Sequence, residues 1–245
     1  WQMGYVFAKH IFGIKGSYAV DPQKGAVVMT LTTQGDVPIH YTLDGSEPTA
    51  ASPRYTGPVE IGKSARFRAT ALREGGENAS YSREFAFSKS TGRPAVLNTK
   101  PNDSYTFEGA SLLVDGYHSR PVFTSGAWLG YLDEPLDVTI DMGGEQSYRS
   151  VELETLAEKG DWIFPPSSVT VWVSDNGTDF TEVASVAVPE PKARDSDGIG
   201  RYRMQFPETS ARYLKVVAQN AAAIPAWHPG AGSKGFLFVD EVVVE

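Results

Sequence analysis

Apolar residues recur at every second position in short runs between about residues 17 and 88. One run carries Val27, Met29 and Leu31, and a later run ends at Asp44-Gly45, a pair that predicts a tight hairpin turn. A period of two is typical of a β-strand with one buried face. About seven such strands in about 75 residues predict a small immunoglobulin-like sandwich.

The alternation returns in the rest of the chain, for example at Val169, Val171 and Val173. Residues 237–244 form an almost continuous apolar run, which is typical of a strand that is buried on both faces. No segment shows the 3.6-residue period of an amphipathic helix. The sequence therefore predicts an all-β fold.

A polar stretch that contains Gly and Pro, residues 89–94, marks a candidate junction between two domains. We divide the chain into residues 1–15, the tail of a preceding domain or a linker, residues 16–89, the first sandwich, and residues 90–245, a second sandwich. The first residue is not Met and no signal peptide follows it. We therefore expect the chain to be a fragment, with any catalytic chemistry upstream.

The chain carries a formal net charge of −8 and no run of Lys or Arg. Nucleic acids and anionic membranes are bound through basic surfaces, so neither is predicted as a partner. Without cysteine the chain has neither disulfides nor a thiol nucleophile. No apolar run approaches the ~18 residues of a membrane-spanning helix, so no membrane span is predicted.

Two parts of the chain resemble known families. Residues 39–49 read Ile-His-Tyr-Thr-Leu-Asp-Gly-Ser-Glu-Pro-Thr and, with the later Tyr55 and Pro58, resemble the chitobiase/β-hexosaminidase C-terminal domain. The region from 95 to 245 resembles a coagulation factor V/VIII type C (discoidin) domain and is similar to carbohydrate-binding module family 32. The segments that carry this second resemblance are 113–116, 126–131, 138–143, 173–180, 211–216 and 238–242.

Together the resemblances imply an immunoglobulin-like sandwich followed by a discoidin-like jelly-roll sandwich. In this order they are similar to the C-terminal region of a bacterial family 20 exo-β-N-acetylhexosaminidase, which would be periplasmic or extracellular. The chain would then be a non-catalytic accessory region that contributes binding of glycans with terminal N-acetylhexosamine or galactose. The N-terminal catalytic domain of the parent enzyme would be its other partner.

Two alternatives to glycan binding stay open. The first is a purely structural module that packs on the catalytic barrel of the parent enzyme and stabilises it. The second is adhesion to protein or lipid, which the acidic charge opposes.

The sequence predicts no catalytic site. By the resemblance, family 20 enzymes use an adjacent Asp-Glu pair at the mouth of a (β/α)8 barrel, and the chain lacks the strand–helix alternation of such a barrel. Asp133-Glu134 precedes a proline and is predicted to be a turn. Asp240-Glu241 lies within the last strand, where consecutive side chains are expected on opposite faces, unable to hold one sugar between them. The four histidines show no metal-ligand spacing.

The loop at residues 227–236 carries an indole and an imidazole, which a simple turn does not need. Aromatic and polar side chains on a rigid β scaffold commonly form sugar-binding surfaces, and the resemblance implies loops at one end of the sandwich. The alternative is that the indole closes the end of the sandwich and the imidazole hydrogen-bonds a loop backbone. The candidate carbohydrate-binding residues are Trp227, His228, Tyr117, His118 and Arg120.

The resemblance also implies a structural Ca²⁺ between an Asp-Gly loop and a Glu near the C-terminus. Asp115 and Glu241 match these two positions. The loop then continues with Arg120 and lacks further Asp or Asn oxygens, which opposes a cation. The alternative role for Asp115 is that of a turn former.

The other tryptophans of the second domain are assigned to packing. Trp128 and Trp162 are expected in the core or at its rim. Trp172 lies on the face opposite the valines of its strand, and we expect it to contact the neighbouring domain.

Overall fold

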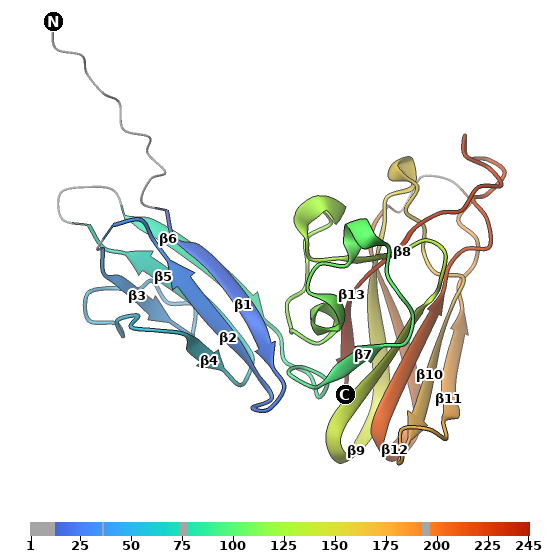
Figure 1. Ribbon diagram of the computed structural model, residues 1–245, viewed down its shortest axis with the longest axis horizontal. Helices are drawn as coiled ribbons and strands as arrows, with labels where there is room; N and C mark the ends of the chain where they lie inside the picture. The colour runs from blue at the N-terminus through green and yellow to red at the C-terminus, as the bar shows by residue number, and fades with distance from the viewer. Residues whose placement is uncertain (1–12, 36, 74–77, 193–196) are drawn as a thin grey trace, which may run out of the picture. The chain divides into compact units, whose positions relative to one another are not determined.

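The computed structural model describes residues 13–35, 37–73, 78–192 and 197–245. The chain divides into two compact units, residues 1–86 (unit 1) and 87–245 (unit 2) (Figure 1). The sequence placed this division between residues 89 and 90. The tail or linker expected for residues 1–15 lies almost entirely outside the described residues.

The described residues of unit 1 form two three-stranded antiparallel sheets, ordered β1-β2-β4 and β3-β5-β6. Alternate side chains of the strands are buried, as the sequence pattern predicts: Val27, Met29 and Phe67 are fully enclosed. The described part holds six strands, where about seven were expected. They are β1 (Lys15–Asp21), β2 (Ala26–Thr32), β3 (Ile39–Thr42), β4 (Val59–Ile61), β5 (Ala65–Ala71) and β6 (Ala79–Phe85).

The hairpin predicted at Asp44-Gly45 is wrong, because β3 pairs with β5 and not with the chain that follows the turn directly. The carboxylate of Asp44 accepts hydrogen bonds from the backbone N–H of Ser46 (2.9 Å) and from its hydroxyl (2.6 Å), which closes a local turn. The chain later returns to β3, where the N–H of Tyr55 donates to the carbonyl of Ile39 at 2.8 Å. A wide loop therefore replaces the tight hairpin.

Unit 2 is built on one continuous sheet, ordered β11-β10-β12-β9-β13-β8, with β7 also paired to β9. In the described part of unit 2, four short 3-10 helices accompany the sheet, three of them between β7 and β8 (Figure 1). The strands are β7 (Ala95–Leu97), β8 (Leu129–Tyr131), β9 (Leu136–Ala157), β10 (Ser168–Ser174), β11 (Thr181–Ala187), β12 (Gly198–Gln219) and β13 (Leu237–Val244). The helices are η1 (Asp103–Tyr105), η2 (Gly109–Leu113), η3 (Phe123–Ser125) and η4 (Lys159–Asp161).

Two strands of 22 residues, β9 and β12, pair with each other along their lengths (Figure 1). Ile140 and Leu153 of β9 belong to the same core cluster, although a straight strand would hold them about 43 Å apart at ~3.3 Å per residue. The ribbon must therefore fold over on itself. The pairing shifts register on β12 between residues 205 and 213, and Gly143 opposite has φ +79°. One folded ribbon thus supplies both layers of the sandwich.

The cores match the predicted pattern. Every residue of β13 except Val243 is buried, as the apolar run predicts. Trp128 is fully buried with Leu156 and Phe238 in a second cluster, and its indole N–H donates to the carbonyl of Arg120 at 3.0 Å. The two-sandwich, all-β prediction is confirmed. Among the described residues, no helix has the length and apolar character to cross a membrane.

We expect Phe67→Ala to lower the free energy of unfolding of unit 1 by about 3–5 kcal/mol, because the ring is fully buried. Unit 2 holds four of the five tryptophans, so tryptophan fluorescence follows unit 2 while far-UV circular dichroism follows both units. In urea, the variant should show an earlier dichroism transition with an unchanged fluorescence midpoint. Leu153→Ala in unit 2 is the matched control and should move the fluorescence midpoint. A fluorescence shift caused by Phe67→Ala would show that the units do not unfold independently.

Candidate functional site

Trp227 and His228 lie in the loop that joins β12 to β13, at the end of unit 2 where η4 also lies (Figure 1). The imidazole is only 4% exposed. Its Nδ1 accepts the N–H of Gly230 at 3.0 Å, so Nε2 carries the proton and donates to the carbonyl of Lys159 at 2.8 Å. Both ring nitrogens of His228 are therefore engaged by backbone groups, the arrangement that the sequence left as an alternative.

Three aromatic rings stand edge-on around this imidazole: Trp162, Phe164 and Trp227, with centroid distances of 6.2, 5.5 and 5.5 Å. The indole N–H of Trp227 donates to the carbonyl of Pro191 at 2.7 Å, and its ring is partly exposed. Trp162 is 43% exposed. The sequence assigned Trp162 to the core or its rim, and the structure places it at the rim, packed against Gly230 and His228.

The backbone at Trp162 is left-handed, with φ 65° and ψ 25°, a conformation that a bulky residue rarely adopts. Such backbone strain costs about 1–3 kcal/mol and persists where the surroundings enforce it. The N–H of Trp162 donates to the carbonyl of Lys159 at 3.2 Å. Nζ of Lys159, whose side chain is 1% exposed, lies 2.5 Å from the carboxylate of Asp197 and anchors the turn.

Gly230 lets the Trp162 ring rest on the neighbouring loop. A Cβ atom at Gly230 would lie 2.8 Å from Cζ2 of Trp162, closer than a real contact allows. The Trp162 indole is thus held against loop backbone on one side and open to solvent on the other. The local turn signal before this tryptophan is Gly160-Asp161, and it gives no indication that the following indole is exposed.

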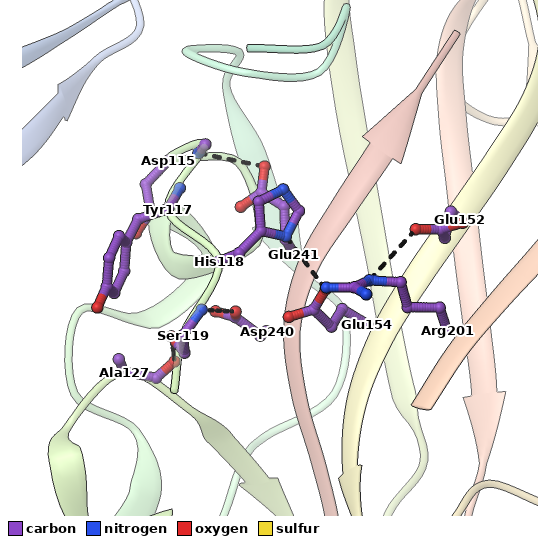
Figure 2. Close-up of polar contacts among 11 residues, drawn as sticks. Asp115, Tyr117, His118, Ser119, Ala127, Glu152, Glu154, Arg201, Asp240 and Glu241 are labelled. Carbon is purple, nitrogen blue, oxygen red and sulfur yellow. Dashed lines mark hydrogen bonds and ion pairs between the residues drawn. The ribbon is translucent and has the colours of Figure 1, made fainter. Parts of the chain in front are cut away.

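A second group surrounds the loop 115–119, between η2 and η3 (Figure 2). The carboxylate of Asp115 accepts the N–H of Tyr117 at 2.7 Å, which makes the turn expected of an Asp at this position. The N–H of Gly116 donates to Glu241 at 3.2 Å, and the N–H of Ser119 donates to Asp240 at 2.7 Å. Two consecutive residues of β13 thus fasten one loop.

This contact corrects the expectation that Asp240 and Glu241 point to opposite faces. The pairing of β13 with β9 shifts register between Val239 and Val242, so the two acidic residues lie in an irregularity of the strand. Strict alternation holds only for a regular strand. The irregularity allows both carboxylates to reach the loop 115–119 (Figure 2).

Three buried carboxylates therefore influence one another. Burial raises the pKa of Glu241 well above its ordinary value, and the charges of Asp115 and Asp240 raise it further. Burial likewise raises the pKa of Asp240, and the N–H of Ser119 offsets part of that rise. Oε2 of Glu241 has no hydrogen-bond partner within the described chain. An unpartnered oxygen beside two other carboxylates suits a cation ligand.

The donor set limits what cation could bind. Among the described residues, no group of three or more His, Cys, Asp or Glu side chains is arranged for a metal ion. Asp115 and Glu241 therefore suit only an ion that takes most of its ligands from backbone carbonyls or water. Calcium, with six to eight oxygen ligands, is such an ion.

His118 extends from the same loop to the strands (Figure 2). Its Nδ1 lies 3.1 Å from Glu154 of β9, a carboxylate only 1% exposed, and Nε of Arg201 on β12 lies 2.8 Å from the same oxygen. The hydrogen bond with Glu154 raises the pKa of His118, while burial and the charge of Arg201 oppose that rise. Arg201 also lies 3.8 Å from Glu152.

The five candidate sugar ligands fall into two groups. Trp227 and His228 belong to the loop between β12 and β13, and His228 contacts the turn at η4. Tyr117, His118 and Arg120 belong to the segment after η2, where Tyr117 is partly buried and Arg120 exposed. Sequence reasoning missed the partners of both groups. They are Trp162, Lys159, Glu154 and Arg201.

Comparison with known families confirms both resemblances. Residues 98–234 match the model of the F5/8 type C domain, and residues 16–83 match that of the chitobiase/beta-hexosaminidase C-terminal domain. The comparison with curated proteins gives no significant match.

Similar solved structures include three bacterial binding modules. Chitosan-binding module 1 of a chitosanase/glucanase from Paenibacillus sp. IK-5 is 17% identical, with 64% of this chain and 98% of that chain covered and a TM-score of 0.42. The module CpGH89CBM32-5 of Clostridium perfringens, in complex with GalNAc-β-1,3-galactose, is 16% identical, with coverage of 62% and 94% and a TM-score of 0.42. A fucose-binding module of Streptococcus pneumoniae is 21% identical, with coverage of 64% and 94% and a TM-score of 0.41.

We expect the imidazole of His118 to titrate above the ordinary histidine pKa, because protonation strengthens its hydrogen bond with Glu154. Since the folded-state pKa is the higher one, the stabilisation is complete below the unfolded-state pKa and is lost as the pH rises through the folded-state pKa. NMR titration of the ring should show the raised pKa, and Glu154→Gln should lower it. The pH dependence of unfolding in this window should disappear in His118→Asn. A His118 pKa at or below the ordinary value would contradict the assignment.

Proposed function

The chain belongs to the F5/8 type C domain family, and from this premise we propose that unit 2 is a glycan-binding module that uses the loops around Trp162 and Trp227. The observation that carries the proposal is the exposed indole of Trp162, held in a strained turn against Gly230. Sugar rings pack their C–H faces on aromatic rings. Strain at an exposed aromatic residue is typical of a functional site.

The rigidity of this turn favours binding. Ordering a side chain on association costs about 0.5–1.5 kcal/mol, and a ring that is already held in place avoids most of that cost. Backbone bonds occupy both nitrogens of His228, so we assign it to positioning the two indoles and not to contacting sugar. Tyr117, His118 and Arg120 remain the polar candidates from the neighbouring loop.

The segment 16–83 supports a wider proposal about the parent protein. A chitobiase/beta-hexosaminidase C-terminal domain directly before the F5/8 type C domain suits an accessory region of a secreted bacterial exo-β-N-acetylhexosaminidase. Terminal N-acetylhexosamine or galactose is then the proposed ligand class, and the catalytic domain of the parent is a proposed partner. The chain itself is proposed to be non-catalytic.

One observation favours the structural alternative. His228 is buried and the indole N–H of Trp227 is bonded to the carbonyl of Pro191, as expected if this loop only closes the end of the sandwich. A module of this kind would stabilise the catalytic barrel and bind no glycan. The exposure of Trp162 favours glycan binding over a loop that only closes the end of the sandwich, because closing the sandwich needs no strained, exposed indole.

We also propose a structural Ca²⁺ with Asp115 and Glu241 among its ligands. It is supported by their burial, by the raised pKa of Glu241 and by its unpartnered Oε2. The ion would offset the mutual repulsion of the buried carboxylates and so strengthen the attachment of the loop 115–119 to β13. Its role there is to hold the loop that bears Tyr117 and His118.

We expect Trp162→Ala to weaken glycan binding about tenfold, equivalent to about 1.4 kcal/mol, by removing the stacking surface. Isothermal titration with N-acetylglucosamine, N-acetylgalactosamine and galactose gives the affinity and the preferred sugar. Trp227→Ala should also weaken binding, while Val96→Ala, an exposed apolar residue on β7, should not. Absence of binding to the unmodified chain, or equal affinity in Trp162→Ala, would favour the structural function.

Calcium should raise the melting temperature of unit 2, and EDTA should lower it again. An ion at 100 times its Kd adds about 2.7 kcal/mol to the free energy of unfolding. Glu241→Gln should abolish the response to calcium, and in EDTA it should stabilise unit 2, since it removes a buried charge. Glu182→Gln on exposed β11 is the control and should keep the response. Equal melting temperatures with calcium and with EDTA would exclude the site.

A further inference from the structure

A groove runs along the outer face of unit 2, over the seam between β10 and β12. Its volume is about 410 Å³. The residues that line it are Thr170, Trp172, Thr178, Phe180, Lys215, Val217 and Gln219. None of these residues belongs to the loops around Trp162 or to the loop 115–119, so the β10–β12 groove is separate from the proposed loop site.

The pairing register fixes which side chains reach this groove. Trp172 lies opposite Lys215 and Thr170 lies opposite Val217, so the four form two neighbouring rungs. The residues between them on each strand, such as Val171 and Val216, are fully buried in the core. Since side chains alternate across a strand, the four groove residues must face outward.

Lys215 is held in place over an aromatic ring. Its Nζ lies 4.2 Å from the ring centroid of Phe180, which sits in the turn after β10. No ion pair of Lys215 with a carboxylate is found in the described residues, and it is the only charged side chain that lines the groove. Glu182 lies opposite Trp172 on the other neighbouring strand, β11, and does not line the groove. Lys215 is therefore the only charge among the lining residues, and the carboxylate of Glu182 belongs to the next strand beside Trp172.

The lining combines a tryptophan, a phenylalanine, two threonines, a glutamine and this one cation. Aromatic faces with hydroxyl and amide groups beside them suit the C–H faces and hydroxyls of sugars. From Lys215 to Gln219 the groove follows β12 for about 13 Å at ~3.3 Å per residue, so an extended ligand can lie along it. The unpaired ammonium suits a carboxylate or sulfate of that ligand.

We propose that the β10–β12 groove binds a glycan strand and that Lys215 receives an acidic group of one of its sugars. The inference depends on the proposed function only in taking the ligand to be a glycan. The two sites share no residue, so glycan binding at one can be tested and contradicted independently of the other. With the second site, the module would bind the terminal sugar of a glycan at the loops and internal sugars of an acidic glycan at the groove.

The test uses the full chain and three oligosaccharide probes of equal length. Chitin oligosaccharide is neutral, hyaluronan oligosaccharide carries carboxylates, and keratan sulfate oligosaccharide carries sulfates without uronic acid. The expected result is saturable binding of at least one acidic probe, with backbone NMR shifts at Trp172 and Lys215. The acidic probe that binds identifies whether carboxylate or sulfate is the preferred group.

Two variants test the assigned roles. Lys215→Met should weaken the binding of the acidic probe roughly fivefold, the size expected for a partly exposed ion pair. The acidic probe should then bind no more tightly than chitin oligosaccharide. Trp172→Ala should weaken the acidic probe about tenfold by removing the stacking surface. Lys100→Met changes the net charge equally at another site and should have no effect. Both groove positions face outward, so melting temperatures close to that of the unmodified chain confirm that the variants are folded.

The outcomes separate the two proposals. If neither acidic probe binds, or if binding persists unchanged in Trp172→Ala and Lys215→Met, the groove proposal is wrong. If Trp162→Ala alone removes all binding, the loop site is supported and the groove proposal is wrong. If Trp172→Ala removes binding while Trp162→Ala does not, the groove is supported and the proposed loop site is wrong.

Discussion

The pairing of β9 with β12 is the constraint on which the rest of unit 2 depends. Two strands of 22 residues form a single hydrogen-bonded ribbon that folds over and contributes to both layers. The pairing places Glu154 of β9 beside Arg201 of β12, and further along β12 it leaves Lys215 beside Trp172 of β10. A change of one residue in this register would turn the buried side chains outward and disperse both groups.

The loop 115–119 is attached to β13 where the regular pairing of that strand is interrupted. The irregularity of β13 brings Asp240 and Glu241 to two backbone N–H groups of the same loop, where regular alternation would separate them. The cost is a set of buried carboxylates, whose burial, and after it their mutual repulsion, raises the pKa values of Asp240 and Glu241. Buried carboxylates without full compensation are costly unless a cation or a proton accompanies them.

The two aromatic surfaces of unit 2 are constructed in different ways. At the loop end, Trp162 depends on a strained backbone, on the small size of Gly230 and on the buried pair of Lys159 and Asp197. On the sheet face, Trp172 depends on the regular pairing of β10 with β12, while the pairing of β10 with β11 shifts register beside it. The first surface is therefore sensitive to loop composition, whereas the second is as stable as the sheet. Loops can change specificity while the sheet keeps its geometry.

Much of this architecture was readable from the sequence, since alternation of apolar residues is a local property with a fixed period. It identified the buried faces of β2, β10 and β13, and local motifs identified both families. The turn at Asp115 could also be predicted from the sequence, because an Asp side chain often accepts a hydrogen bond from the backbone N–H two residues later.

Other features were decided only by the tertiary structure. The loop after Asp44 and the shared loop contact of Asp240 and Glu241 differ from the sequence expectation, and the left-handed backbone of Trp162 had no signal in the sequence. Each depends on strand register or on a neighbour distant in the chain, such as Gly230 beneath Trp162. The sequence by itself thus determined which segments become strands and which faces they bury. Only the tertiary structure decided which polar and aromatic side chains meet, because those meetings are set by long-range pairing and packing that no local pattern encodes.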